Sequence, residues 1–217
     1  MSNQILANTI VYGVPRCPQC GVSNPLLEKV DKAHKHYTSS GYQTIEYWFF
    51  TARCSKCRKH ILFYGKRDVD NHREEEAKDL WIIRSYPAVE QAAEELPEMA
   101  YKFFQQALES KHAPDGALML AASAIDAMLK DKGYKDGTLY ARIQAAQTDG
   151  LLTKEMSAWA HEIRLSANDP RHADDNFSGA SEEEAEQVIA FVKSLGDYLY
   201  VLPARVRKWQ AKVSNDS

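Results

Sequence analysis

The four cysteines of this 217-residue chain form two Cys-x-x-Cys pairs, Cys17/Cys20 and Cys54/Cys57. Each pair brings two sulfurs onto one tight turn, so that both can reach a single metal ion at roughly 2.3 Å. Two such turns complete a tetrahedron and leave no coordination position open for a substrate. The pattern therefore predicts one structural zinc ion held by all four cysteines. Because 33 residues separate the pairs, which exceeds the usual ~15–20, we expect an insertion between them.

The residues around the second pair help to separate zinc binding from the other uses of paired cysteines. Ile45–Phe50 and Ile61–Tyr64 are strand-like runs on either side of Cys54/Cys57, as in a ribbon hairpin. A redox dithiol would instead lie between a strand and a helix. Disulfides would need an oxidising compartment, and residues 1–12 do not resemble a secretion signal, so we expect a cytoplasmic protein. Four histidines are alternative ligands that we interpret as surface residues: His34, His36, His60 and His72.

Charge is distributed unevenly along the chain. The formal net charge of −3 argues against a protein that coats nucleic acid indiscriminately. Residues 51–67 nevertheless contain six basic and no acidic residues, whereas residues 68–98 contain ten acidic and three basic ones. The basic segment suits contacts with phosphates, or simply keeps a ribbon soluble.

No stretch approaches the ~18–20 apolar residues of a membrane span, so we expect no membrane partner.

The hydrophobic pattern becomes helical after residue 95. Pro97 is typical of a helix start, Gly133 of a helix end, and Ser181-x-x-Glu184 of a capping box before the last long helix, which Pro203 should end or kink. We therefore predict an α+β protein, with a small β unit followed by an all-α bundle of about five helices. The expected divisions are a zinc ribbon at 1–67, an acidic connector at 68–95, the helical bundle at 96–203 and a basic tail at 204–217.

Several common catalytic motifs are missing from the sequence. It contains no Gly-rich phosphate loop, no Gly-x-Ser-x-Gly elbow and no His-Glu-x-x-His. Their absence argues against the commonest nucleotide-hydrolysing, acyl-transferring and zinc-protease chemistries.

One polar constellation remains as a candidate site. On the helix expected from Thr153, the side chains of Ser157, His161, Arg164 and Asn168 recur at helical spacing and share one face. Asp169-Pro170-Arg171-His172 follows directly. Arg164, Asn168, Arg171 and His172 therefore either converge where the helix ends or belong to a solvated flank and an exposed turn.

Several elements resemble the HEPN superfamily (higher eukaryotes and prokaryotes nucleotide-binding), in particular an uncharacterised bacterial branch that often carries an N-terminal zinc ribbon. The resemblance covers roughly residues 96–203. It is carried by four motifs: Leu96-Pro97-Glu98, the run Ala117–Leu129, Leu139-Tyr140-Ala141-Arg142-Ile143, and Ile163-Arg164-Leu165-x-x-Asn168-x-x-x-His172. It implies a HEPN-like helical fold and a homodimer.

The resemblance also implies an activity. Active HEPN ribonucleases carry an Arg-x(4–6)-His motif, paired across a dimer, and cleave RNA without metal by attack of the ribose 2′-OH on the neighbouring phosphate. An arginine fork suits the developing phosphorane charge, and a histidine can transfer the proton. His172 occupies the His position and Asn168 the polar position, whereas Ala167 stands where the Arg is usual. Arg164, one helical turn earlier, and Arg171 are the candidates for the guanidinium.

The second helix also departs from the branch. Ser123 stands where a basic residue is common, and Asp126 where Glu is common.

Two functions follow as hypotheses from the resemblance and from these departures. The first is a dimeric, metal-independent endoribonuclease in a defence or toxin role. The alternative is a non-catalytic HEPN-like module that binds nucleotide, RNA or a protein partner, with the ribbon as its contact surface.

Overall fold

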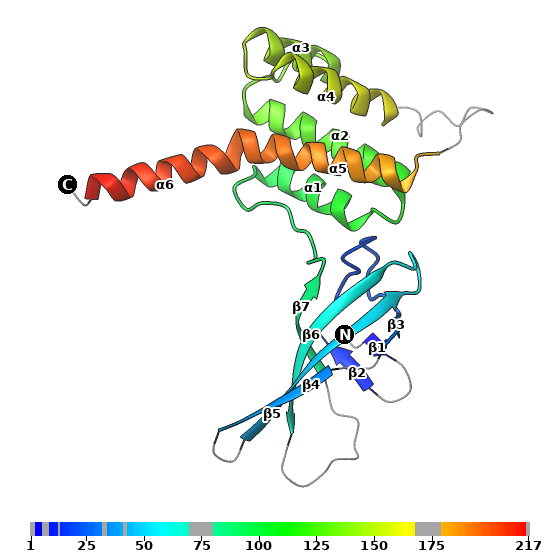
Figure 1. Ribbon diagram of the computed structural model, residues 1–217. Coiled ribbons are helices and arrows are strands. Elements are labelled where there is room, and N and C mark those ends of the chain that lie inside the picture. Colours follow the sequence, from blue (N-terminus) through cyan, green and yellow to red (C-terminus); the bar gives the residue numbers. More distant parts are fainter. Residues whose placement is uncertain are drawn as a thin grey trace. The chain divides into compact units, whose positions relative to one another are not determined.

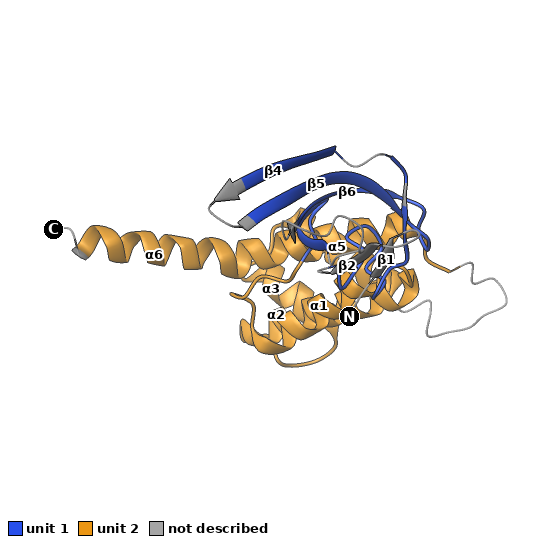
Figure 2. Ribbon diagram, turned by 90° about the horizontal axis from the view of Figure 1, so that it is seen from below, with its two compact units in different colours: residues 1–90 blue, residues 91–217 orange. Residues whose placement is uncertain are grey.

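The computed structural model describes residues 3–5, 9–12, 14–31, 34–40, 43–69, 80–167 and 179–215. The chain divides into two compact units, Met1–Glu90 and Gln91–Ser217 (Figure 2, blue and orange). The first is a sheet and the second is helical, so the predicted α+β class is confirmed (Figure 1). Among the described residues, no helix has both the length and the apolar character needed to cross a membrane.

The first unit is a curled sheet with the strand order β3-β1-β2-β7-β6-β5-β4. Most neighbours are antiparallel, and among the described strands only the short β1–β3 and β2–β7 pairings are parallel. Because β3 also pairs with β5, six of the strands form a ring. The strands are β1 (Asn3–Ile5), β2 (Thr9–Tyr12), β3 (Leu27–Lys29), β4 (His34–Ser40), β5 (Gln43–Cys54), β6 (His60–Val69) and β7 (Leu80–Tyr86).

Alternation along β5 and β6 gives the sheet one buried face. Phe50, Ala52 and Cys54 of β5 are buried, as are Ile61 and Phe63 of β6, whereas the residues between them point to the opposite face. A small core forms on the buried face. It consists of Val14, Cys17, Cys20, Leu27, Phe50, Ala52, Cys54, Ile61, Phe63 and Leu80.

A β-bulge between β6 and β7 depends on Gly65. The register shifts between Tyr64 and Gly65. A Cβ atom at Gly65 would lie 2.8 Å from the carbonyl oxygen of Trp81, closer than side chains pack. Glycine therefore allows β7 to approach β6 at this point. As a result Leu80–Tyr86 belongs to the sheet, and the first unit extends to Glu90 instead of ending at residue 67.

In its described residues, 91–167 and 179–215, the second unit contains five helices and a sixth that continues the fifth. They are α1 (Glu98–Glu109), α2 (Pro114–Asp131), α3 (Leu139–Thr148), α4 (Lys154–Ser166), α5 (Glu182–Gly196), the π-helical turn η2 (Asp197–Val201) and α6 (Leu202–Asn215). Side chains cap three of the N-termini: Thr138 accepts from Ala141, Thr153 from Met156, and Ser181 forms the predicted capping box with Glu184.

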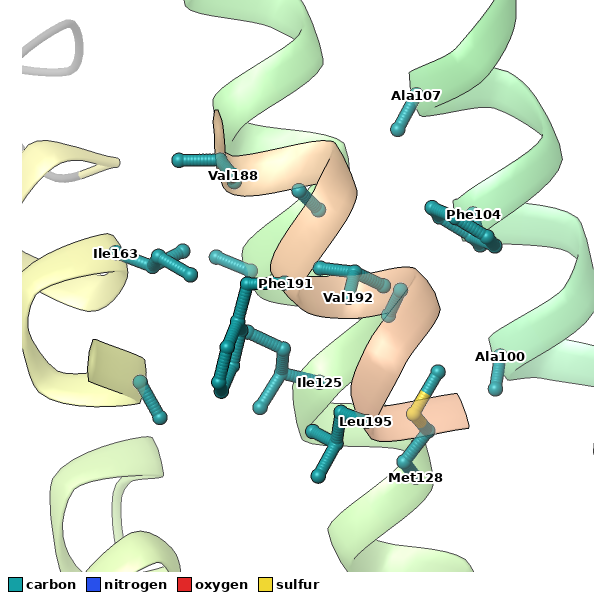
Figure 3. Packing of buried hydrophobic residues seen from close by; sticks show 14 of the residues in the cluster. Ala100, Phe104, Ala107, Ile125, Met128, Ile163, Val188, Phe191, Val192 and Leu195 are labelled. Carbon is teal, nitrogen blue, oxygen red and sulfur yellow. The ribbon is translucent and has the colours of Figure 1, made fainter. Parts of the chain in front are cut away.

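Helix α2 lies at the centre of the bundle and contacts α1, α3, α4 and α5 (Figure 1). Its Ala117, Ala121 and Ala124 are fully buried, and small side chains let neighbouring helices approach closely. Figure 3 shows how Ile125 and Met128 of α2 meet Phe191 and Leu195 of α5 in the core.

The C-terminus differs from the sequence expectation. Of the two outcomes expected at Pro203, a helix end or a kink, the helix end is wrong, because Pro203 lies in the first turn of α6; the segment expected as a basic tail at 204–217 is helical to Asn215. Proline has no N–H to donate to the preceding turn. The π turn before it, in which the Leu202 N–H reaches back to the Asp197 carbonyl, accommodates this break in the hydrogen-bond pattern. Helix α6 extends beyond the rest of the bundle (Figure 1).

Candidate functional site

The four cysteines come together in the first unit. Cys17 and Cys20 lie on the turn after β2, Cys54 ends β5, and Cys57 lies on the turn before β6. Their Sγ atoms all lie within 4.8 Å of one another, and the Sγ atoms of Cys17 and Cys57 are 3.9 Å apart. Ligands at roughly 2.3 Å from a tetrahedral ion are separated by roughly 3.8 Å. The donor set therefore fits a tetrahedral metal ion.

The two cysteine turns have the same backbone geometry. The Gly21 N–H donates to the Cys17 carbonyl at 2.9 Å, and the Arg58 N–H donates to the Cys54 carbonyl at the same distance. Both Gly21 and Arg58 have positive φ, at 75° and 62°. Arg58 therefore occupies a left-handed position that glycine adopts more easily. Its guanidinium lies 3.5 Å from the Glu28 carboxylate.

Burial controls the chemistry of these thiols. It raises the pKa of the Cys17 thiol well above the ordinary value and that of Cys20 to about 11. For Cys54, burial also opposes ionisation, but backbone N–H groups of Cys57 and Lys56 donate to the sulfur, and the net effect lowers its pKa. Buried thiols become thiolates readily when a cation neutralises them.

The alternative histidine ligands do not join the cluster. In the described parts of the chain, the metal-binding group consists of the four cysteines alone. His34 and His36 are exposed on β4, and His60 contributes its backbone carbonyl to a 3.1 Å hydrogen bond from Gln19 Nε2. His72 lies outside the described residues.

A cleft of about 1040 Å³ lies in the helical unit. Its walls come from α1, α2, α3 and the end of α4. Its charged and polar lining includes Ser123, Asp126, Lys130, Tyr140, Arg142 and Arg164. The cleft thus holds Ser123 and Asp126, the two second-helix positions that depart from the HEPN branch, together with Arg164.

Arg142 is neutralised within the cleft. Its Nη1 donates to Asp126 Oδ1 at 2.6 Å, and its Nη2 donates to the Lys135 carbonyl at 3.1 Å. Lys130 lies 2.6 Å from the other carboxylate oxygen of Asp126. This network joins α3 to α2, so we interpret Arg142 and Asp126 as structural residues.

Arg164 has a different environment. Its guanidinium lies over the Tyr140 ring, with 5.5 Å from Cζ to the ring centroid. Its Nε is buried without a hydrogen-bond partner, as is that of Arg142, but Arg164, unlike Arg142, forms no ion pair with a carboxylate of the described residues. The Arg164 guanidinium therefore lies in the cleft, and its positive charge is not compensated by the side chains described around it.

His161 lies beside Arg164 on α4. Its ring is 4.7 Å from that of Tyr140, and its Nε2 lies 2.8 Å from Gln144 Nε2. Its Nδ1 is buried without a partner among the described residues. Burial, and then the charge of Arg164, lower the pKa of His161 below its ordinary value, while Glu162 opposes this shift. His161 is thus held as a neutral imidazole facing α3.

The structure tests only part of the predicted polar constellation. Ser157, His161 and Arg164 do share one face of α4, but Ser157 is buried and the other two are half-buried, so this face is not a solvated flank. Ala167 lines the cleft. Asn168, Arg171 and His172 lie outside the described residues. The sequence did not indicate the Arg142–Asp126 pair, because those residues are 16 positions apart and meet only through helix packing.

Comparison with known families gives a match to the helical unit. Residues 102–214 match the model of a domain of unknown function, DUF4145. The chain belongs to this family. The DUF4145 match runs from α1 to α6, so it includes most of the cleft and excludes the cysteine site. No curated protein and no solved structure matches the chain significantly.

Proposed function

We propose that the DUF4145 unit is a HEPN-like module that binds the phosphate of an RNA or nucleotide at Arg164, and that the cysteine site holds a structural zinc ion. The uncompensated Arg164 guanidinium in the cleft carries this proposal, since a planar cation with unused donors matches a phosphate. Tyr140, which already packs against the guanidinium, adds an aromatic surface for a base.

Zinc is the metal that the sulfur ligand set favours. Four thiolates in tetrahedral arrangement suit zinc or an iron–sulfur centre, and a ribbon built on two cysteine turns is a usual zinc structure. The four cysteines would hold the ion, whose role is to join the two turns. All four coordination positions are then used by the protein, so we assign the metal no part in chemistry at the cleft.

Cleavage of the bound RNA is the second candidate function. Ala167 lines the cleft, and His172 follows five residues later, within roughly 17 Å of extended chain. A histidine that reaches the phosphate held by Arg164 would accept the proton of the ribose 2′-OH and return one to the leaving oxygen. The attacking group then belongs to the substrate, and no metal is needed. As in the HEPN ribonucleases that the sequence resembles, we expect two chains to form the complete site.

The experiment separates binding from cleavage. Fluorescence anisotropy with a labelled single-stranded RNA in EDTA measures affinity, and gel analysis of the same sample measures cleavage. We expect Arg164→Ala to weaken binding about 10- to 100-fold, as loss of hydrogen bonds to a charged group does. Arg164→Lys should recover part of the affinity. Lys154→Ala, on the exposed start of the same helix, is the matched control.

His172 decides between the two functions. If the protein is a ribonuclease, His172→Ala should abolish cleavage and leave RNA affinity nearly unchanged, and DNA should remain intact because it lacks the 2′-OH. If Arg171 supplies the catalytic guanidinium, Arg171→Ala should be the variant that loses cleavage, and Arg164→Ala should not. Wild-type protein that binds RNA without cutting it would leave the binding module as the function. Unchanged affinity in Arg164→Ala would refute the phosphate site.

A further inference from the structure

The face of the sheet opposite its core carries aromatic and basic side chains, which we call the outer face. Register places Phe49 opposite Tyr64, and Tyr64 opposite Arg84, across β5, β6 and β7. Residues paired in this way point to the same side of a sheet. The outer face comprises His36 of β4, Tyr47 and Phe49 of β5, Leu62, Tyr64 and Lys66 of β6, and Trp81, Arg84 and Tyr86 of β7.

Four of the rings form one group across three strands. His36 stacks on Tyr47 with 4.8 Å between ring centroids, and Phe49 stacks on Tyr64 at 4.5 Å. Tyr47 and Tyr64 are 5.7 Å apart. The ring planes in these pairs differ by only 9° to 23°, so the rings stand nearly parallel. A flat base fits against such a group as a further member of the stack.

The outer face is exposed, although it is apolar. Phe49 is 38%, Leu62 43% and Tyr86 53% exposed. The core on the other face already buries Phe50, Ile61 and Phe63, so these outer residues are not needed to cover it. An exposed apolar patch on a sheet of this size indicates a binding surface.

The charges on this face are positive. Lys66 lies opposite Tyr47, and Arg84 lies opposite Tyr64. Within the described residues, no carboxylate forms an ion pair with either of them. Glu28 of β3, which lies opposite Arg53 of β5, pairs with Arg53 and Arg58, and Glu46 points to the opposite face. Lys66 and Arg84, which have no ion-pair partner among the described residues, therefore flank the aromatic group.

We propose that the outer face binds single-stranded nucleic acid, with bases stacked on the aromatic rings and phosphates held by Lys66 and Arg84. Aromatic rings interleaved with basic side chains are what unpaired strands need, because every base has a flat face and every linkage a negative charge. A second copy of the chain fits less well, since it would bring two sets of Lys66 and Arg84 together. The proposal deepens the proposed RNA function but rests on different residues in a different unit.

The test measures oligonucleotide binding by the full chain. Fluorescence anisotropy gives its affinity for a 12-nucleotide oligouridylate and for a duplex of the same length. Tyr64→Ala and Tyr86→Ala should each weaken single-strand binding about 5- to 100-fold, the loss expected when one stacked base is released. Tyr64→Phe keeps the ring and should bind like wild type. Tyr198→Ala, an exposed tyrosine of the helical unit, is the matched control. Zinc content and circular dichroism establish that each variant is folded.

A salt titration tests the basic residues. Replacing Lys66 and Arg84 by alanine together should reduce the slope of log affinity against log salt by roughly 1.4, or 0.7 for each lost phosphate contact. Ultraviolet crosslinking followed by peptide mapping separates this site from the cleft. Crosslinks in residues 44–66 that survive Arg164→Ala support the outer face even if the cleft proposal fails.

Three results would overturn the proposal. Wild-type protein that binds no single strand, or that prefers the duplex, excludes a stacking surface. Unchanged affinity in both Tyr64→Ala and Tyr86→Ala excludes these rings as the site. If either variant lowers the oligomeric state in light scattering while oligonucleotide affinity is unchanged, the outer face is a protein interface.

Discussion

At the residue scale, the environment of Arg164 separates it from Arg142, the other arginine that lines the helical cleft. Arg142 has a carboxylate at 2.6 Å and a backbone carbonyl at 3.1 Å, which explains its position without a ligand. Arg164 has an aromatic ring and a neutral histidine. A cation kept half-buried without a counter-charge is destabilising unless a ligand or another segment compensates it, so we infer that Arg164 is the first candidate for contact with a ligand.

The pKa of His161 reports on this charge. Because the folded protein holds that pKa below its ordinary value of 6.5, the neutral ring contributes stability at neutral pH that is lost as the pH falls through the lowered value. We expect Arg164→Met to raise the pKa of His161, measured by NMR titration of the ring proton. Glu162→Gln is the control of opposite sign and should lower it. A His161 pKa that does not move in either variant would contradict this electrostatic coupling.

Cys54 provides the second prediction at this scale. Wild-type protein purified without chelator should contain one zinc ion per chain by elemental analysis, and Cys54→Ser should lose it, because three thiolates hold a structural ion poorly. The serine variant should also unfold the first unit. Ser55→Ala, on the same turn, should keep its zinc. Absence of zinc from the wild-type protein would refute the zinc assignment. Iron found in its place would identify the site as an iron–sulfur centre.

At the element scale, local sequence signals determine where the helices begin. The Ser181 hydroxyl accepts from the Glu184 N–H, and the Glu184 carboxylate accepts from the Ser181 N–H at 2.7 Å. A tertiary contact also fixes the position where α5 begins. The Ala180 N–H donates to the carboxylate of Asp115, at the start of α2, at 2.8 Å. The capping box was predicted from sequence, whereas the Asp115 contact was not, since it joins residues 65 positions apart.

Removing the cap should weaken α5 measurably. Ser181→Ala leaves the first N–H groups of the helix without their side-chain acceptor and should lower the free energy of unfolding by ~1 kcal/mol. Ser194→Ala is the matched control, because that exposed hydroxyl only donates back to the Ala190 carbonyl within α5. Thermal melting followed at a helical circular dichroism band measures both. Equal melting temperatures for Ser181→Ala and Ser194→Ala would contradict the role of the cap.

At the scale of the whole molecule, α6 presents an apolar stripe to solvent. Leu202, Val206, Trp209 and Val213 recur at alternating four- and three-residue spacing and are 50%, 52%, 67% and 47% exposed. This spacing is that of a helix seam that packs against another helix. The homodimer expected from the HEPN resemblance would provide such a partner.

We therefore expect self-association to depend on α6. Wild-type protein should be a dimer in light scattering at tens of micromolar, and Val206→Glu should shift it toward monomer by placing a charge in the seam. Lys208→Glu makes an acidic substitution away from the stripe and should leave the dimer intact. A monomeric wild type would contradict both the dimer and a catalytic site composed of two chains. A dimer unaffected by Val206→Glu would place the interface elsewhere.

The sequence by itself determined the features that depend on local chemistry. Paired cysteines, turn glycines, caps and helical periodicity act over a few residues, so the cysteine cluster, the α+β class and the helix starts could be read in advance. Only the tertiary structure decided which distant residues meet. It closed the sheet through β7, which the sequence assigned to a connector, and continued the last helix past Pro203. It also paired Arg142 with Asp126 while leaving Arg164 uncompensated among the described residues. These outcomes depend on packing between segments far apart in the chain, for which one sequence carries no periodic signal.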